Sequence, residues 1–324
     1  STYVELTRML NFLYCFDKNY NNQAFTSMAS LLDKVSEKIN IFIIHKSINN
    51  EKIIPSFIVS HKNLNELKIY QYNSKIESYP NIENAHVSEA TYYRIFFDEY
   101  LPKDLNHIIY LDSDFICGEN PVFEIKKNLT LLLNSDFTVG AVTQTYKNEQ
   151  NRELFERINM QSSVYFNAGF LVIDIESWKK NLIKDKFFEK LQNLEFDLKF
   201  WDQDLLNHIF DGNYLQLSKY LNFQMRLDKN IYEYIEFNEE EVLFYHFLGK
   251  QKPWVGRGLF AKNTEIYQKE YRKHSNKTYH IEHIWFLLSI KYLLRSFTNL
   301  SFFNIKYKSK FLYYFFSSFF GIKE

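Results

Sequence analysis

The chain has 324 residues, of which 39 are basic and 39 acidic, so its formal net charge at pH 7 is zero. That balance argues against a nucleic-acid-binding protein held by a broad basic face. The chain contains only 8 glycines and 5 prolines, which argues against a linker-rich or disordered protein. Its length predicts one large domain or two smaller ones.

The two cysteines and the start of the chain suggest a cellular setting. Cys15 and Cys117 lie far apart within apolar stretches, so we expect free thiols in a reducing cytoplasm rather than a disulfide framework. The start carries no secretory signal, and we expect Met9 to be the natural first residue, with residues 1–8 foreign to the natural chain. The sequence has no run of 18 uncharged apolar residues, which disfavours a membrane-spanning helix.

The first hundred residues alternate between patterns typical of strands and of helices. Continuous apolar runs indicate strands that are covered on both faces. This alternation predicts an α/β fold built on a doubly wound sheet. In chain order we expect a strand at 10–16, a helix at 23–38, a strand at 39–44, a helical segment around Leu64, a strand at 67–70, and a helix capped by Ser88 that ends near Pro102.

The next segment joins a strand directly to two carboxylates. Ile108-Ile109-Tyr110-Leu111 predicts a buried strand, and Asp112-Ser113-Asp114 follows it. Residues two apart in an extended chain point the same way, so both aspartates would project at the strand end, where open α/β sheets bind ligands. Adjacent carboxylates repel unless a cation lies between them, and a hard divalent ion that also holds a diphosphate meets that need. The alternative is an exposed acidic pair in a turn.

Three more polar clusters lie in the middle of the chain. Asn167-Ala168-Gly169 lies at the start of an expected strand at 166–174, and Asp202-Gln203-Asp204 opens an expected helix at 202–209. The cluster from His246 to Lys252 begins at the end of an expected strand at 242–247. Each has an ordinary explanation, namely a turn, a helix N-cap, a core histidine or a surface lysine. We also expect a strand at 137–142 and helices at 152–158 and 177–194.

Together and in this order, the clusters resemble glycosyltransferase family 8, whose retaining enzymes include bacterial lipooligosaccharide galactosyltransferases and glycogenin. The resemblance runs from about Leu10 to Trp254. It implies a GT-A fold, a Rossmann-like mixed sheet flanked by helices, with a UDP-galactose or UDP-glucose donor and a Mn²⁺ or Mg²⁺ ion. The motifs that carry it are Y-L-D-S-D, F-N-A-G-F-L-V-I-D, D-Q-D-L-L-N and H-F-L-G-K-Q-K-P-W.

The resemblance also implies roles for individual residues. The metal ligands would be Asp112, Asp114 and His246, a set that suits octahedral Mn²⁺. The catalytic residues would be Gln203, beside the anomeric carbon, and Asp202. An amide is a poor nucleophile, which favours front-face attack, although a covalent route through Asp202 stays open. The implied donor-binding residues are Asp17, Asn19, Arg94, Asp112, Ser113, Asn167, Ala168, Gly249 and Lys252.

The expected activity is therefore transfer of a hexose from a UDP-sugar to a saccharide acceptor, with the core of lipooligosaccharide or lipopolysaccharide as the first candidate. Gln144 stands where the family strand often ends in Asp near the acceptor, which leaves the acceptor less certain. The alternatives are a protein-linked glycan, including self-glycosylation on tyrosine, and an inactive binder of UDP-sugars.

The C-terminal part differs from the rest of the chain in composition. Residues 281–297 predict an apolar helix, and Ser301 to Phe320 contain ten aromatic residues. Residues 279–324 contain six basic residues and two acidic ones. We expect a catalytic domain at 9–260 and an aromatic and basic helical extension at 261–324 that holds a cytoplasmic protein against the anionic inner face of the membrane. The alternative is that these aromatics pack as ordinary core.

Overall fold

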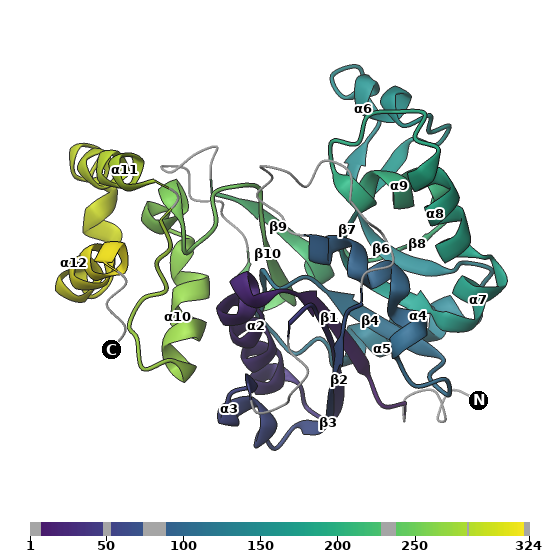
Figure 1. Ribbon diagram of the computed structural model, residues 1–324, viewed down its shortest axis with the longest axis horizontal. Coiled ribbons are helices and arrows are strands. Elements are labelled where there is room, and N and C mark those ends of the chain that lie inside the picture. The colour runs from purple at the N-terminus through teal and green to yellow at the C-terminus, as the bar shows by residue number, and fades with distance from the viewer. Residues whose placement is uncertain (1–7, 48–52, 74–88, 228–237, 284, 321–324) are drawn as a thin grey trace.

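The computed structural model describes residues 8–47, 53–73, 89–227, 238–283 and 285–320 (Figure 1). The expected cap at Ser88 and residues 1–7 lie outside the described residues. The C-terminal helices occupy one end of the molecule, helices α6 to α9 occupy the other, and the strands lie between them (Figure 1). Cys15 and Cys117 are buried free thiols, as expected.

A mixed sheet of seven strands forms the centre, in the order β3-β2-β1-β4-β7-β6-β8. Strand β1 is parallel to β2 and β4, whereas β7 is antiparallel to both β4 and β6. This arrangement confirms the expected Rossmann-like mixed sheet. The strands are β1 (Asn11–Phe16), β2 (Ile39–His45), β3 (Leu64–Gln71), β4 (His107–Leu111), β6 (Val139–Tyr146), β7 (Val164–Asp174) and β8 (Leu215–Gln216).

Helices cover both faces of this sheet because its strands are apolar on both sides. In β1, Leu13 and Cys15 pack into one hydrophobic cluster, whereas Phe12, Tyr14 and Phe16 pack into another. The first cluster includes residues from η3 (Glu89–Phe96), α4 (Phe97–Tyr100), α7 (Ile175–Lys180), α8 (Ile183–Gln192) and α9 (Trp201–Phe210). The second includes residues from α2 (Asn21–Lys34), α3 (Ser56–Val59) and α5 (Val122–Leu133). Helix α6 (Arg152–Arg157) belongs to a separate small cluster.

A second, three-stranded sheet lies beside the first, in the order β5-β10-β9. Its strands are β5 (Phe115–Cys117), β9 (Phe223–Arg226) and β10 (Phe244–Leu248). Strand β5 is antiparallel to β10 and pairs Phe115 with His246. This pairing brings His246 next to the end of β4, more than 130 residues earlier in the chain. The sequence pattern predicts neither β5 nor β9, because each is only three or four residues long.

The C-terminal part is helical, as expected. Helix α10 (Thr264–His274) packs against α2, and α11 (Phe286–Thr298) and α12 (Lys308–Ser317) lie beyond it with the short turns η6 (Gly256–Phe260) and η7 (Ser301–Asn304). These elements share a small core of their own, while α10 joins a cluster with Trp254 and Phe247. The members of the small core are Leu259, Phe260, Tyr279, Ile281, Leu293, Phe302, Ile305, Phe311 and Phe315.

Several expected elements have different bounds in the structure. Leu64 begins a strand instead of lying in a helix, and the first long helix ends at Lys34, where Val35 turns to an extended conformation. The helix expected at 177–194 is two helices, because Leu182 between them has a φ of +52°. The C-terminal apolar helix begins at Phe286, five residues later than expected.

Candidate active site

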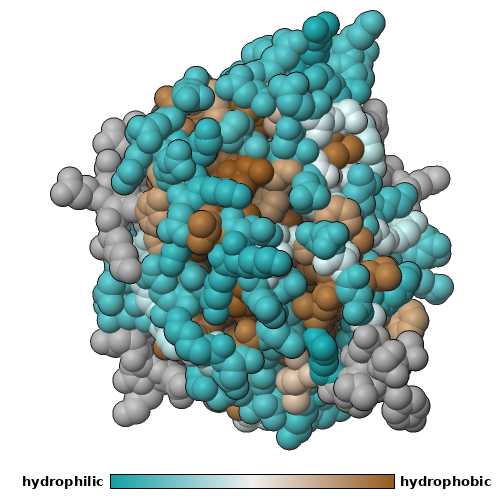
Figure 2. All heavy atoms as spheres, turned by 90° about the vertical axis from the view of Figure 1, so that its right-hand side faces the viewer, coloured by the Kyte–Doolittle hydropathy of each residue, from teal (hydrophilic) through white to brown (hydrophobic). Residues whose placement is uncertain are grey.

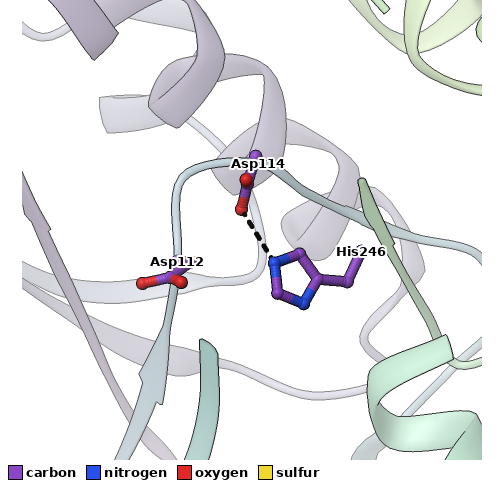
Figure 3. Close-up of side chains that lie close together, drawn as sticks. All are labelled: Asp112, Asp114 and His246. Carbon is purple, nitrogen blue, oxygen red and sulfur yellow. Dashed lines mark ion pairs between the residues drawn. The ribbon is translucent and has the colours of Figure 1, made fainter. Parts of the chain in front are cut away.

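The turn between β4 and β5 carries the two aspartates. Strand β4 ends at Leu111, and the backbone N–H of Asp112 donates to the carbonyl of Gly169 on β7, with 2.9 Å between N and O. Asp114 follows in the turn before β5. Figure 3 shows Asp112 at the strand end and Asp114 in the turn, both near His246 of β10. The aspartates therefore lie at the carboxyl end of a central strand.

A chain of side-chain contacts orients His246. Its Nδ1 lies 2.9 Å from Oδ1 of Asn222, and Nδ2 of Asn222 donates to Oδ1 of Asn167 at 2.8 Å. The ring stacks on Phe115 with 4.1 Å between centroids. Because Nδ1 donates to a carbonyl oxygen, the neutral imidazole has its lone pair on Nε2. That atom lies 3.4 Å from Oδ1 of Asp114.

Asp112, Asp114 and His246 fit a divalent cation. One ligand atom from each lies within 4.8 Å of the others. Oδ1 of Asp114 is buried without a hydrogen-bond partner. A side chain on Gly169 would enter the same space, since its Cβ would lie 2.7 Å from His246 and 2.9 Å from Asp112. Two carboxylates and an imidazole are a donor set that suits Mn²⁺.

Lys252 extends into the same site. Its Nζ lies 2.6 Å from Oδ2 of Asp114 and also donates to the carbonyl of Phe247. Burial works to raise the pKa of Asp114, but the nearby charge of Lys252 outweighs it and holds that pKa well below its usual range. The chain reaches Lys252 through Gly249, whose φ of +80° is one that glycine adopts without strain. Asp114 is therefore a carboxylate at neutral pH.

A buried ion pair lies behind the aspartates. Arg94 Nε lies 2.7 Å from Oδ2 of Asp202, and its NH1 lies 3.4 Å from Oδ1 of Asp112. The guanidinium also lies 4.3 Å from the centroid of the Tyr110 ring. Thr91 donates to Asp202 at 2.7 Å. Asp202 is only 1% exposed, and burial raises its pKa to about 6. Asp202 is thus engaged by Arg94 and Thr91, not by the end of its helix.

Gln203 belongs to a network of amides beside the first half of β7. Its Oε1 accepts from the backbone N–H of Ala168 at 2.9 Å and from Nδ2 of Asn167 at 3.2 Å. Its Nε2 donates to the hydroxyl of Tyr165 at 3.1 Å. Gln144 accepts from the same Asn167 amide at 2.9 Å. The structure therefore brings together Gln144, Asn167, Ala168 and Gln203, which the sequence separates by up to 59 residues.

The second aspartate of the D-Q-D cluster has a structural role. Asp204 is fully buried and accepts from both terminal nitrogens of Arg157, at 2.9 and 3.1 Å. It also accepts from the hydroxyl of Tyr165 and from the backbone N–H groups of Lys199 and Phe200. These bonds satisfy the carboxylate and fix the start of α9.

A cleft of about 530 Å³, part of it open to solvent, contains the aspartates. Ser113 and Lys252 line it, while Asp17 caps the turn η1 (Lys18–Tyr20) by accepting from the N–H of Asn19 at 2.9 Å. Sequence reasoning does not assign six cleft residues, although one of them, Tyr110, stands in the quoted motif Y-L-D-S-D. These six are Cys15, Phe16, Tyr20, Ala90, Thr91 and Tyr110. Asn222, which orients His246, carries no sequence signal.

The sequence of this chain is similar to one protein family and to several curated relatives. The model of the family described as "Glycosyl transferase family 8" matches residues 11–257. The "Lipopolysaccharide 1,2-glucosyltransferase" of Escherichia coli is 26% identical over 292 residues, covering 82% of this chain and 83% of the relative. The "Lipopolysaccharide 1,3-galactosyltransferase" of Salmonella typhimurium is 24% identical over 261 residues, covering 77% of this chain and 74% of the relative.

A solved structure shares the fold. The galactosyltransferase LgtC, crystallised in complex with donor and acceptor sugar analogs, superposes with a TM-score of 0.67 at 21% identity. The match covers 82% of this chain and 97% of LgtC. This likeness confirms the GT-A architecture that the sequence motifs predict.

Proposed function

Because this chain belongs to glycosyl transferase family 8, we propose that it is a retaining hexosyltransferase that moves galactose or glucose from a UDP-sugar to a saccharide acceptor. One observation carries the proposal. Asp112, Asp114 and His246 converge beside Gly169, in a site that Lys252 also enters. The names of the Escherichia coli and Salmonella relatives favour the core of lipopolysaccharide or lipooligosaccharide as the acceptor.

The proposal gives a role to each predicted metal-binding and donor-binding residue. Asp112, Asp114 and His246 would hold Mn²⁺, or Mg²⁺, which when bound offsets the negative charge of the UDP leaving group. Lys252 supplies an ammonium for the diphosphate, together with the backbone at Gly249. The remaining donor contacts that we propose are Asp17 and Asn19 to the uridine, and Arg94, Ser113, Asn167 and Ala168 around the diphosphate and sugar.

Retention of the sugar configuration limits the roles of Gln203 and Asp202. Asp202 is buried and paired with Arg94 at 2.7 Å, so it would have to leave that pair to attack a sugar carbon. Gln203 is partly exposed, and its amide is fixed by Ala168 and Tyr165. This arrangement supports front-face attack, with Gln203 stabilising the positive charge that develops at the anomeric carbon.

The C-terminal helices support a peripheral membrane location. Helix α11 buries Ser289 and Ser296, whereas Leu287 is 80% and Leu294 is 62% exposed. Trp285, just before the helix, is 72% exposed. Leu293 is buried in the small C-terminal core, so α11 has apolar side chains on both its buried and its exposed sides. Among the described residues the exposed leucines have no partner.

The charge of this part points to the kind of partner. Residues 285–320 contain five basic residues and no acidic one. At the opposite end of the molecule hydrophilic side chains dominate, and hydrophobic ones form small separate patches (Figure 2). Among the described residues no helix is both long and apolar enough to cross a bilayer. We therefore propose that α11 and α12 lie in the interface of an anionic membrane, at the inner leaflet.

The test of the enzymatic proposal is release of UDP from a panel of UDP-sugars with Mn²⁺ and with chelator, followed by transfer to purified lipooligosaccharide. We expect Mn²⁺-dependent hydrolysis of UDP-galactose or UDP-glucose and an α-linked product by NMR. UDP-sugar binding without any UDP release would identify an inactive binder. A β-linked product would exclude retention, and transfer to protein alone would exclude the glycolipid acceptor.

A further inference from the structure

A small pocket lies where the turn η6 meets helix α11, outside the cleft described above. The empty space at this pocket, which includes open solvent, is about 200 Å³. Arg257 comes from η6, Arg295 from α11, and Asn299 and Ser301 from the turn that follows α11. Phe260, Tyr292 and Ser296 complete the lining.

Ser296 and Asn299 in the lining have hydrogen-bond partners, since Ser296 donates to the carbonyl of Leu293 and Asn299 accepts from the N–H of Ser301, but other polar groups of this pocket lack partners. Within the described ranges, neither Arg257 nor Arg295 forms an ion pair, whereas Arg94, Arg157 and Arg272 each pair with a carboxylate. Nε of Arg257 is buried without an acceptor. Ser301 is 4% exposed, and its Oγ is likewise buried without a hydrogen bond.

These groups define the chemistry of a ligand. Buried polar groups in native proteins are almost always hydrogen-bonded, so an N–H and a hydroxyl without partners in one pocket call for an acceptor there. Two guanidinium groups require that acceptor to be anionic. Donors that approach from η6, from α11 and from Ser301 suit a tetrahedral anion with several oxygens, and the planar fork of arginine matches phosphate.

The surroundings indicate where such a phosphate would come from. Leu294 and Phe297 flank Arg295 on α11, and Leu300 follows the helix. All three are exposed, at 62%, 39% and 65%. Apolar side chains next to an anion site are the arrangement expected for a molecule with a phosphate group and an acyl chain.

We propose that this pocket binds a phosphate group, carried either by a membrane lipid or by the glycolipid acceptor. Binding of the phosphate itself depends only on the pocket. The lipid source rests on the proposed membrane location, so the two are tested separately.

The first experiment uses inorganic phosphate and the full chain. At low salt, we expect phosphate to raise the Tm of the native protein and of Lys291→Gln, but not of Arg257→Gln or Arg295→Gln. Lys291 is the matched control because it is an exposed cation on the same helix as Arg295. The Tm measured without phosphate reports whether each variant folds. If phosphate raises the Tm of all four proteins equally, the pocket is not a phosphate site.

The second experiment identifies the source of the phosphate. Vesicles of phosphatidylcholine with phosphatidylglycerol are compared with vesicles that carry equal charge as oleate, which has a carboxylate instead of a phosphate. We expect Lys291→Gln to weaken binding to the first kind by about fivefold, the effect of one charge near an anionic surface. Arg295→Gln should weaken binding to the same vesicles by roughly 25-fold, because a charge-assisted hydrogen bond to phosphate contributes about twice the binding free energy of a charge without one.

Soluble probes separate the two sources. Tighter binding of dihexanoyl phosphatidate than of glucose 6-phosphate would indicate a lipid headgroup, and the reverse order would indicate a phosphorylated saccharide on the acceptor. Equal losses for Arg295→Gln and Lys291→Gln on both kinds of vesicle would overturn the lipid source and leave only general charge attraction. Loss of vesicle binding in all proteins, with phosphate stabilisation intact, would refute the membrane proposal and not the pocket.

Discussion

Gly169 and His246 approach so closely that only glycine fits between the strands that carry them. A Cβ on Gly169 would lie 2.7 Å from Cε1 of His246. The same Cβ would lie 2.9 Å from Oδ2 of Asp112. Since real contacts of a Cβ are essentially never shorter than 3.0 Å, strand β7 leaves room for ligands from β10 and β4 to converge only because this position lacks a side chain.

We therefore predict that Gly169→Ala displaces His246 or Asp112 and removes metal-dependent turnover while the protein stays folded. The matched control is Gly140→Ala on the neighbouring strand β6, where the nearest atom to the Cβ would be a terminal methyl of Leu217, at 3.0 Å. UDP release and Mn²⁺ affinity are measured for both variants, with circular dichroism to check folding. Normal Mn²⁺ affinity in Gly169→Ala would show that the ion does not bind between these residues.

Asp114 gives a direct test of the metal site. Asp114→Ala should abolish turnover, but it would also leave the buried ammonium of Lys252 without the carboxylate that lies 2.6 Å away. Asp114→Asn keeps a hydrogen-bond acceptor and is the sharper variant. We expect kcat to fall roughly a thousandfold, because several kcal/mol of charge stabilisation are lost. Asp136→Asn, at an exposed position before β6, is the control. Near-normal activity of either Asp114 variant in chelator would refute the assignment.

Gln203 tests the mechanism of retention. If its amide stabilises charge only in the transition state, Gln203→Ala should lower kcat by roughly ten- to a thousandfold and change the donor KM little. A purely structural role, through its bonds to Ala168 and Asn167, would instead lower the Tm and raise KM. Gln192→Ala at an exposed site on α8 is the control. A sugar trapped covalently on Asp202 of the native enzyme would contradict front-face attack.

The sequence predicts the site best where its signals are local. The apolar run of β4 and the two aspartates lie within seven residues, and the structure places them together as a strand and the turn that follows it. The partners of Asp202 show the limit of such reasoning. The sequence offers a helix N-cap as the ordinary explanation for Asp202, but the residue before α9 is Phe200, and Asp202 pairs with Arg94, 108 residues earlier. No periodicity within one element reports a contact of that length.

Other features of the structure could not be predicted from the sequence for related reasons. Asn222 orients His246 through a single hydrogen bond between residues 24 apart, and no pattern marks it. Helix α10 is rich in charged residues, so its mean hydropathy is low, yet Tyr267 and Tyr271 pack into a core with Trp254. Some aromatic residues of the C-terminal extension are buried as core and others are exposed, so neither of the two predictions for this segment describes all of them. Their composition alone cannot assign which are core and which are exposed, since Phe311 and Phe315 are fully buried whereas Phe303 and Tyr313 are exposed.

His107 predicts a pH dependence of stability outside the active site. Its ring is buried at the start of β4, and burial lowers its pKa to about 4. In the unfolded chain the imidazole of His107 has a pKa near 6.5, so between pH 4 and 6.5 it binds a proton that it does not bind in the folded chain. His107 therefore contributes stability that is complete above pH 6.5 and is lost as the pH falls toward 4.

The expected loss is at most about 3 kcal/mol, from a shift of roughly 2.5 pKa units. The free energy of unfolding is measured with urea at pH 7.0, 5.5 and 4.5. It should fall less steeply with decreasing pH in His107→Gln than in the native protein. His61→Gln, at a half-buried position, is the control for loss of a histidine. An unchanged slope in His107→Gln would show that the ring is protonated in the folded state.

The exposed apolar side of the C-terminal helices predicts membrane binding that can be separated from catalysis. Deletion from about Ser301 onward would also remove Phe311 and Phe315, which are fully buried, so replacing exposed side chains is the cleaner change. We expect the triple variant Leu287→Ser, Leu294→Ser and Phe303→Ser to lose at least about a hundredfold in affinity for anionic vesicles. Burial of each of these side chains contributes roughly 1.5–3 kcal/mol.

The matched control replaces Val59, Phe123 and Leu131, which are equally apolar and exposed but lie on α3 and α5. That control should bind vesicles normally, and both triple variants should keep the native Tm and the native rate of UDP release. Binding should also weaken with salt, because the five basic residues from 285 to 320 attract the anionic surface through a screened field. If the native protein ignores anionic vesicles at low salt, the membrane proposal fails and the apolar side of α11 must have another partner.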